Sequence, residues 1–339
     1  MKQRNRGLYN LGNTCYLNSA LQALRHAKPF ADYFLSDTWK THRHPERNGH
    51  DLTGDIVELL HEFGQDSRIA INPRKLVSAF YKVAKERGLD DEFYQGAQAD
   101  GTEAVLLILQ VLHEQQARHV NMKVAGTAKN AEHVEYIRSL ESWANFFHKE
   151  YSPIVESFYG QTQSQLRCEC GSVTTRYEPW GVLKVPIPNA EKQGAPAPNL
   201  QQCITAAFAS ETLDDYTCDS CKVKGKVRSE HHISRFPTHM ILGLKRYTNT
   251  GAKVRARIPY DVDLIDFSEW TCWPSIQTSS KYRVYAVIDQ MGSSRGGHYN
   301  MRVTADGSVW NRYDDTNCSV ASEGGVAGQD TLMLFLERL

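Results

Sequence analysis

The amino-acid sequence predicts an α+β protein, with helices in the first part of the chain and strands in the rest. Up to about residue 135, apolar residues recur at helical spacing in segments separated by polar connections. From Ile154 onward, alternating apolar positions and turn residues are typical of strands. The chain has 339 residues, of which 41% are hydrophobic and 23% charged, so it can bury a sizeable core.

The first predicted helix carries a cysteine, Cys15, in its first turn. The apolar residues after it have the i, i+3, i+4, i+7 spacing of a helix that buries one face: Leu17, Ala20, Leu21 and Leu24. Asn13 and Thr14 precede it and are good N-cap residues. Unpaired N–H groups and the helix dipole favour the thiolate there, which makes Cys15 a candidate nucleophile. The alternative is a small buried residue at a helix start.

The loop before this helix contains a candidate oxyanion donor. Gly7 and Gly12 permit a tight backbone there. This loop places the side-chain amide of Asn10 where it could donate a hydrogen bond to a developing oxyanion.

Three further segments have helical patterns, over residues 56–63, 76–84 and 142–148. Between the first two helices of the chain, residues 38–50 form a histidine-rich connection. We interpret it as a solvated loop, because its histidines do not have the spacing of a metal site on one helix face. Residues 117–138 are polar and mixed, so we expect a surface connection there.

A helix that is apolar on nearly every side follows residue 100, and we expect it to be buried. Asp100 and Glu103 at its start have the spacing of a capping box. The functional interpretation is that these two carboxylates meet a cationic peptide. Both interpretations can hold, because a cap uses only one carboxylate oxygen.

Strand patterns extend over residues 154–168, 180–187 and 240–247, with a proline-rich loop over residues 186–198. Two close cysteine pairs lie between or beside these strands: Cys168, Cys170, Cys218 and Cys221. Four thiolates at the ends of two hairpins predict a structural Zn²⁺ site. The first pair has only one intervening residue, fewer than zinc sites usually have, and the alternative is a pair of turns that need no metal.

The last third of the chain contains a candidate base, His298, after two glycines at a strand start. Residues 298–304 and 308–313 predict a hairpin. A three-residue loop pairs Thr304 with Ser308 and puts His298 opposite Asp314, whereas a two-residue loop puts it opposite Asp315. We choose the three-residue loop, and so Asp314, because it keeps the apolar residues of both strands on one face.

These stretches together resemble the ubiquitin-specific protease family. They comprise Gly7 to Gln22, Gln98 to Glu103, Leu242 to Tyr247, Tyr282 to Gly292, Gly296 to Tyr299 and Asp314-Asp315. Two departures are Asp289-Gln290, where the family usually carries an Asn-His or similar pair, and the short spacing from Cys168 to Cys170. The resemblance covers nearly the whole chain.

The resemblance implies a papain-like cysteine protease of hand shape, with residues 1–339 as a single catalytic domain. A helical thumb would cover residues 1–140, β fingers with part of the palm residues 155–240, and a β-sheet palm residues 241–339. The implied catalytic residues are Cys15 as nucleophile, Asn10 in the oxyanion hole, His298 as base, and Asp314, or else Asp315, as its partner. Those implied to contact substrate are Gln98, Asp100, Glu103, Gly297 and Tyr299.

On this resemblance we expect a deubiquitinating enzyme that needs no cofactor for catalysis and acts on ubiquitin and ubiquitinated proteins. The alternatives are a deconjugase of a ubiquitin-like modifier and a catalytically silent ubiquitin-binding module. Lysine plus arginine equal aspartate plus glutamate at 39 each, so we expect no nucleic-acid partner. With no long apolar run and no signal region, we expect no membrane contact and an intracellular monomer of the cytoplasm, the nucleus or both.

Overall fold

Helix α1 (Cys15–His26), which begins at the candidate nucleophile, packs against an eight-stranded sheet and is buried along almost its whole length. The computed structural model describes residues 5–44, 46–47, 50–189, 196–276, 279–293, 296–305, 307–322 and 328–339. Helices precede two sheets along the chain, which confirms the α+β class. Within the described part of the chain, no helix is long and apolar enough to cross a membrane.

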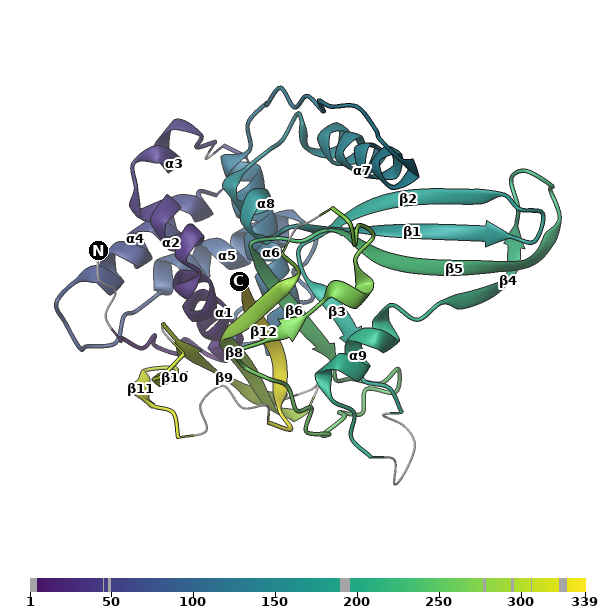
Figure 1. Cartoon of the computed structure of the whole chain (residues 1–339). Helices are drawn as coiled ribbons and strands as arrows, with labels where there is room; N and C mark the ends of the chain where they lie inside the picture. Colours follow the sequence, from purple (N-terminus) through teal and green to yellow (C-terminus); the bar gives the residue numbers. More distant parts are fainter. Residues whose placement is uncertain are drawn as a thin grey trace.

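The other helices lie mainly in the first half of the chain. They are α2 (Lys28–Leu35), α3 (Thr38–Thr41), α4 (Leu52–Gly64), α5 (Arg74–Glu86), α6 (Gly101–Gln116), α7 (Ala131–Phe147), α8 (Pro153–Phe158), α9 (Leu200–Ala207) and the 3-10 helix η1 (Ser268–Trp270). Helices α1, α2, α4 and α5 gather on one side of the molecule (Figure 1). Helix α6 is buried on most sides, as its continuous apolar run predicts.

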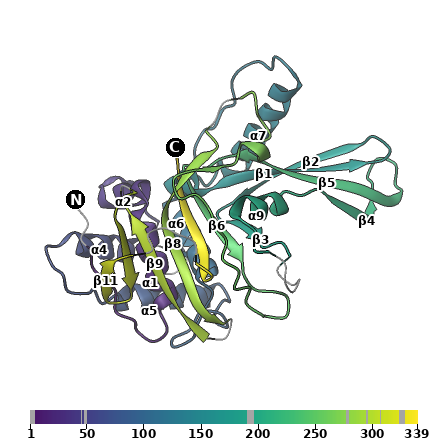
Figure 2. The same ribbon diagram turned by 60° about the horizontal axis from the view of Figure 1, so that its bottom comes forward.

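The strands form two sheets. They are β1 (Gly160–Cys168), β2 (Val173–Trp180), β3 (Leu183–Pro186), β4 (Glu211–Thr217), β5 (Lys224–Arg235), β6 (His239–Lys245), β7 (Ile265–Asp266), β8 (Lys281–Ser293), β9 (Gly296–Thr304), β10 (Trp310–Asp314), β11 (Asn317–Val320) and β12 (Thr331–Arg338). One sheet has the order β2-β1-β5-β4, and the other has the order β11-β10-β9-β8-β12-β6-β3 with β7 beside β8. The four-stranded sheet projects away from the rest of the molecule (Figures 1 and 2).

The eight-stranded sheet separates two apolar cores. One face of β8, β9 and β10 joins α1 and the neighbouring helices in the larger core, which includes Tyr299, Met301 and Tyr313. The other face packs against α9 and residues between 254 and 270. The site described below lies where α1 meets β9. The assignment of residue ranges to thumb, fingers and palm stays a prediction.

Some helix and strand predictions were wrong. Residues 131–147 form one helix, α7, where we expected a surface connection and a short helix. Residues 153–158 form helix α8 instead of the start of a strand, because Ser152 caps it and Pro153 occupies its first position. The strand expected over 180–187 divides between β2 and β3.

Two expected loops fall partly outside the described residues. Residues 38–41 of the histidine-rich connection form α3, while residues 45, 48 and 49 lie outside the described part. In the proline-rich loop, the same holds for residues 190–195.

The register predicted for the hairpin of β9 and β10 was also wrong. Thr304 pairs with Trp310, not with Ser308, so the register is shifted by two residues. Such a shift leaves every side chain on its predicted face, because side chains alternate with a period of two. If the register continues, Asp314 lies opposite Asn300 and diagonally across from His298 on the same face.

Candidate active site

The candidate nucleophile, Cys15, is the first residue of α1 and is 2% exposed. Thr14 occupies the N-cap position, but its hydroxyl accepts a 2.9 Å hydrogen bond from the N–H of Leu11 instead of capping the helix. Asn13 has a left-handed backbone, with φ of 57°. The loop before α1 is therefore a tight turn that delivers the cysteine to the helix start.

The pKa of the Cys15 thiol is shifted upward, contrary to the prediction from the helix start alone. Burial raises this pKa most, and the negative charge of Asp315 adds to the effect. Hydrogen bonds from the backbone of Tyr299 and Tyr16 act in the opposite direction but are weaker. Cys15 is therefore a thiol at rest, and a base must remove its proton before it can attack.

The candidate base, His298, lies in β9, the strand that packs against α1, directly before Tyr299. The Nε2 atom of His298 is 2.5 Å from Oδ1 of Asp314, at the end of β10. The other oxygen of Asp314 is 3.5 Å from Nη2 of Arg312. A carboxylate at Nε2 holds the ring orientation and leaves Nδ1 for proton transfer.

Asp315 has different partners from those of Asp314. Its two carboxylate oxygens accept hydrogen bonds from the side-chain amides of Asn10, at 2.9 Å, and Asn18, at 2.8 Å. Its carbonyl oxygen accepts another from the N–H of Leu8. Asp315 therefore ties the end of β10 to the loop and helix that carry Cys15. Asn18 was missed in the sequence, although it lies one helical turn after Cys15.

The side chain of Asn10 is held at both ends. Its oxygen accepts hydrogen bonds from the N–H groups of Gly12 and Thr14, at 3.1 and 3.0 Å. Its nitrogen donates to Asp315. A side-chain amide nitrogen carries two hydrogens, so one remains for a further acceptor.

Two of the predicted substrate residues, Gln98 and Gly297, bind each other. The Gln98 amide donates to the Gly297 carbonyl at 2.7 Å and accepts from the Gly297 N–H at 2.6 Å. A third, Tyr299, accepts a hydrogen bond from the N–H of Gly101 at 3.2 Å. These contacts fix the strand of His298 against the start of α6.

Asp100 caps α6, because its side chain accepts hydrogen bonds from the N–H groups of Thr102 and Glu103. The predicted capping box is only half present, because the Glu103 side chain does not bond back to the N-cap backbone. Glu103 forms a 2.7 Å ion pair with Lys184 in β3. Asp100 itself is exposed and retains free acceptor capacity.

The four paired cysteines lie together at the far end of the four-stranded sheet. The Sγ atoms of Cys168 and Cys221 are 3.9 Å apart, and those of Cys170 and Cys218 are 3.8 Å apart. All four sulfurs lie within 4.8 Å of one another, a donor set that fits tetrahedral Zn²⁺. Backbone hydrogen bonds, most strongly from Cys221, lower the pKa of Cys218 to about 6, which favours a thiolate ligand.

A buried cysteine at a helix start, beside a strand that carries a histidine–aspartate pair, is an arrangement of the cysteine-protease class. Comparison with known proteins is consistent with this class. The chain belongs to the ubiquitin carboxyl-terminal hydrolase family, whose family model matches residues 6–336. This confirms the resemblance found in the sequence.

Similar proteins include human ubiquitin carboxyl-terminal hydrolase 2, which is 27% identical over 98% of this chain and 54% of the relative. Bovine ubiquitin carboxyl-terminal hydrolase 21 is 27% identical over 98% of this chain and 61% of the relative. The chain thus spans between half and two thirds of the length of these relatives. A chain of the SAGA DUB module Ubp8/Sgf11/Sus1/Sgf73, solved bound to monoubiquitin, superposes with a TM-score of 0.74. It is 19% identical, and the match covers 100% of this chain and 70% of that one.

Proposed function

We propose that this chain is a thiol-dependent deubiquitinating enzyme that hydrolyses the peptide or isopeptide bond after the C-terminal glycine of ubiquitin. The observation that carries the proposal is the 2.5 Å contact of His298 with Asp314, because His298 lies on strand β9, which packs against the helix that begins at Cys15. A structural role alone does not require a histidine held by a carboxylate on the strand that packs against the helix of a buried cysteine. Membership of the hydrolase family supplies the substrate class.

In the proposed mechanism, His298 takes the proton of the Cys15 thiol, and the thiolate attacks the carbonyl carbon of the ubiquitin terminus. Asp314 accepts a hydrogen bond from Nε2 and stabilises the imidazolium that forms. The second hydrogen of the Asn10 amide, with backbone N–H groups, stabilises the oxyanion. His298 then protonates the leaving amine, and water hydrolyses the acyl-enzyme.

The proposed substrate contacts lie at the start of α6 and on the strand of His298. Asp100, exposed at the start of α6, and Glu103 offer carboxylates to the basic tail of ubiquitin. Gln98, Gly297 and Tyr299 would act by fixing the strand beside which the tail lies. Two solved structures with the same fold are bound to monoubiquitin or ubiquitin aldehyde, which supports a ubiquitin-sized partner.

The proposal includes a structural zinc ion held by the four clustered cysteines, with no cofactor in the reaction itself. It also includes a monomer without nucleic-acid or membrane partners in an intracellular setting, the cytoplasm, the nucleus or both. None of the eight cysteines forms a disulfide bond in the structure, which fits a reducing compartment.

Labelling by a ubiquitin probe with a C-terminal electrophile tests the activity. We expect one probe per chain on the unmodified protein and none on Cys15→Ala, which should still bind ubiquitin. Equal labelling of both proteins would contradict the assignment of the nucleophile. Binding without labelling of the unmodified protein would favour a silent ubiquitin-binding module. Labelling only by probes built on a ubiquitin-like protein would favour a deconjugase of a ubiquitin-like modifier.

A further inference from the structure

A cavity of about 480 Å³ opens on the sheet face that carries His298 and Asp314. Its walls come from β8, β9, β10 and two connecting segments. The lining residues are Arg255, Arg257, Asp289, Met291, Asn300, Arg302, Arg312, Gly328, Gln329 and Asp330. A cavity of this volume suits a small ligand.

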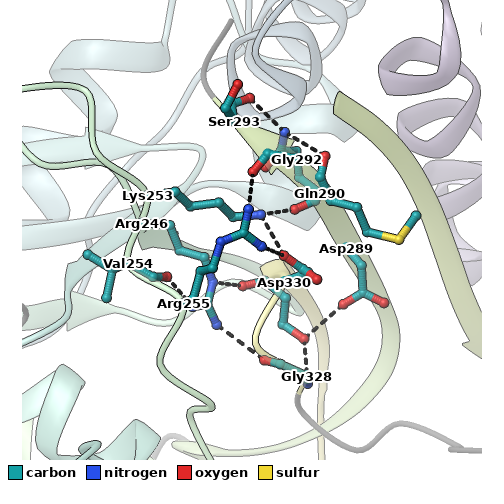
Figure 3. Close-up of polar contacts among 12 residues, drawn as sticks. Arg246, Lys253, Val254, Arg255, Asp289, Gln290, Gly292, Ser293, Gly328 and Asp330 are labelled. Carbon is teal, nitrogen blue, oxygen red and sulfur yellow. Dashed lines mark hydrogen bonds and ion pairs between the residues drawn. The ribbon is translucent and has the colours of Figure 1, made fainter. Parts of the chain in front are cut away.

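The buried Arg246 holds the two connecting segments in place. Its guanidinium donates hydrogen bonds to the carbonyl groups of Val254 and Ala256, at 2.9 and 2.8 Å. It also donates to the carbonyl groups of Gly328, at 3.3 Å, and Thr331. Figure 3 shows Arg246 between the segment of Val254 and that of Gly328. The rim of the cavity is therefore pre-organised, which lowers the entropic cost of binding a ligand.

Among the described lining residues, four arginines and two aspartates give the cavity a net positive charge. Arg302 and Asp289 form a buried pair at 3.0 Å. Asp330 is shared by Lys253, at 2.7 Å, and Arg255, at 3.6 Å (Figure 3). Both aspartates thus already have cationic partners, and the excess positive charge favours an anion.

Two polar groups in the wall lack partners among the described residues. Asn300 lines the cavity, and no side-chain hydrogen bond occupies its amide within the described part of the chain, although its atoms are not fully buried there. The Nε atom of Arg312 is buried and also has no hydrogen-bond partner there. A buried donor without a partner is costly, so a bound oxyanion would stabilise Nε of Arg312, and the Asn300 amide in the same wall would donate to the same ligand.

Arg312 also connects the cavity to the candidate active site. Its Nη2 atom lies 3.5 Å from Asp314, whose other oxygen contacts His298. An anion in the cavity and the charge of Asp314 therefore compete for the same guanidinium.

We propose that this cavity is a binding site for a phosphate-type anion, coupled to Asp314 through Arg312. The planar guanidinium group of Arg312 can donate two parallel hydrogen bonds to phosphate oxygens, and the Asn300 amide supplies an uncharged donor. The ligand is either a free phosphate ester or a phosphate carried on a protein side chain. The site stands on its own geometry and does not depend on the proposed hydrolysis.

Isothermal titration calorimetry of the full chain at physiological salt tests the site. The first probe is fructose 1,6-bisphosphate, with fructose as its uncharged control. The second is a short phosphoserine peptide, with its unphosphorylated form as control. We expect at least one phosphorylated probe to bind with one site per chain, and neither control to bind. The probe that binds more tightly identifies the source of the phosphate.

The variants test where the probe binds. Arg257→Glu, at an exposed lining position, should weaken binding about tenfold or more, because it reverses a charge at the cavity. Lys123→Glu makes the same charge change on an exposed loop elsewhere and should leave binding unchanged. Asn300→Ala should also weaken binding, with thermal unfolding as the check that it folds.

Asp314→Asn tests the coupling, because it removes the negative charge that competes for Arg312 while keeping the shape of the side chain. We expect it to tighten binding severalfold. Absence of binding by both phosphorylated probes, or equal weakening by Arg257→Glu and Lys123→Glu, would overturn the site. Unchanged affinity in Asp314→Asn would overturn the coupling to the active site.

Discussion

The amide of Asn18, in the helix that begins at Cys15, donates a 2.8 Å hydrogen bond to the carboxylate of Asp315 at the end of β10. The neighbouring residue, Asp314, contacts His298 instead. Two adjacent aspartates therefore have separate roles in the same site. One orients the candidate base, and the other attaches the nucleophile's helix and loop to the sheet.

This separation predicts unequal effects of substitution. Asp314→Ala should reduce kcat by about 10³-fold or more, because His298 loses the carboxylate that orients it and stabilises its charge. Asp315→Ala should cost less in kcat and lower the melting temperature, because Asn10 and Asn18 lose their shared acceptor. Hydrolysis of a fluorogenic ubiquitin substrate and thermal unfolding measure the two effects. A greater loss of kcat in Asp315→Ala would mean that our assignment of the two aspartates is wrong.

Asn10→Ala tests the oxyanion donor. Loss of one preorganised donor costs roughly 10²–10³ in kcat. KM should change little, because the hydrogen bond strengthens as the oxyanion forms. Asn13→Gly, in the same loop, is the control, because glycine keeps the left-handed backbone of that position, and it should retain most of the activity. An unchanged kcat in Asn10→Ala would remove Asn10 from the catalytic groups.

Local patterns in the sequence were sufficient for part of this site. The start of α1 at Cys15 and the cap of α6 at Asp100 depend on neighbouring residues, so spacing predicted both. The burial that raises the Cys15 pKa depends on packing against β9, and nothing local reports it. The contact of Asn18 with Asp315 joins residues far apart in the chain, so sequence spacing does not reveal it.

The hairpin of β9 and β10 illustrates the same limit. Burial of one face decides whether side chains point in or out, and the sequence correctly placed Tyr299, Met301, Val303 and Tyr313 on the buried face. Val309, predicted on the same face, precedes β10 and is 51% exposed. A shift by two residues preserves the faces, so the apolar pattern cannot distinguish Thr304 paired with Ser308 from Thr304 paired with Trp310. The contact of His298 with Asp314 survives the shift because diagonal neighbours on one face are within reach of long side chains.

Gly297 and Gly296 offer a matched pair of substitutions. A Cβ atom on Gly297 would lie 2.1 Å from the carbonyl oxygen of Met291, whereas one on Gly296 would have nothing within 4 Å. Gly297→Ala should therefore displace the strand of His298 and lower the melting temperature, and Gly296→Ala should leave it nearly unchanged. Thermal unfolding of both variants checks this. Equal stability of the two variants would contradict the close approach at Gly297.

The cysteine cluster predicts about one zinc ion per chain in the purified protein, measured by elemental analysis. Cys218→Ser should release the metal and lower the melting temperature, because structural zinc contributes folding free energy. Cys272→Ser, outside the cluster, should retain the metal. If the unmodified protein is purified without metal and has the same melting temperature as Cys218→Ser, the cysteine pairs form turns that do not need zinc.

His239 predicts a loss of stability in acid. Its ring is buried beside Phe158 and Tyr285, and burial lowers its pKa from the ordinary 6.5 to about 4. The unfolded chain therefore binds a proton between these values while the folded protein does not, so stability is full above about pH 6.5 and falls as the pH drops towards 4. A pKa shift of this size corresponds to a loss of unfolding free energy on the order of 3 kcal/mol once the pH has fallen to about 4.

His239→Leu removes this titration while keeping an apolar side chain at the position. The unfolding free energy of the variant should fall less than that of the unmodified protein between pH 7 and pH 5. His133→Leu makes the same substitution at a half-exposed position at the start of α7 and is the matched control. Urea titrations at several pH values measure the slopes. Parallel curves for His239→Leu and the unmodified protein would mean that His239 is protonated equally in the folded and unfolded states, because only a difference in bound protons makes stability depend on pH.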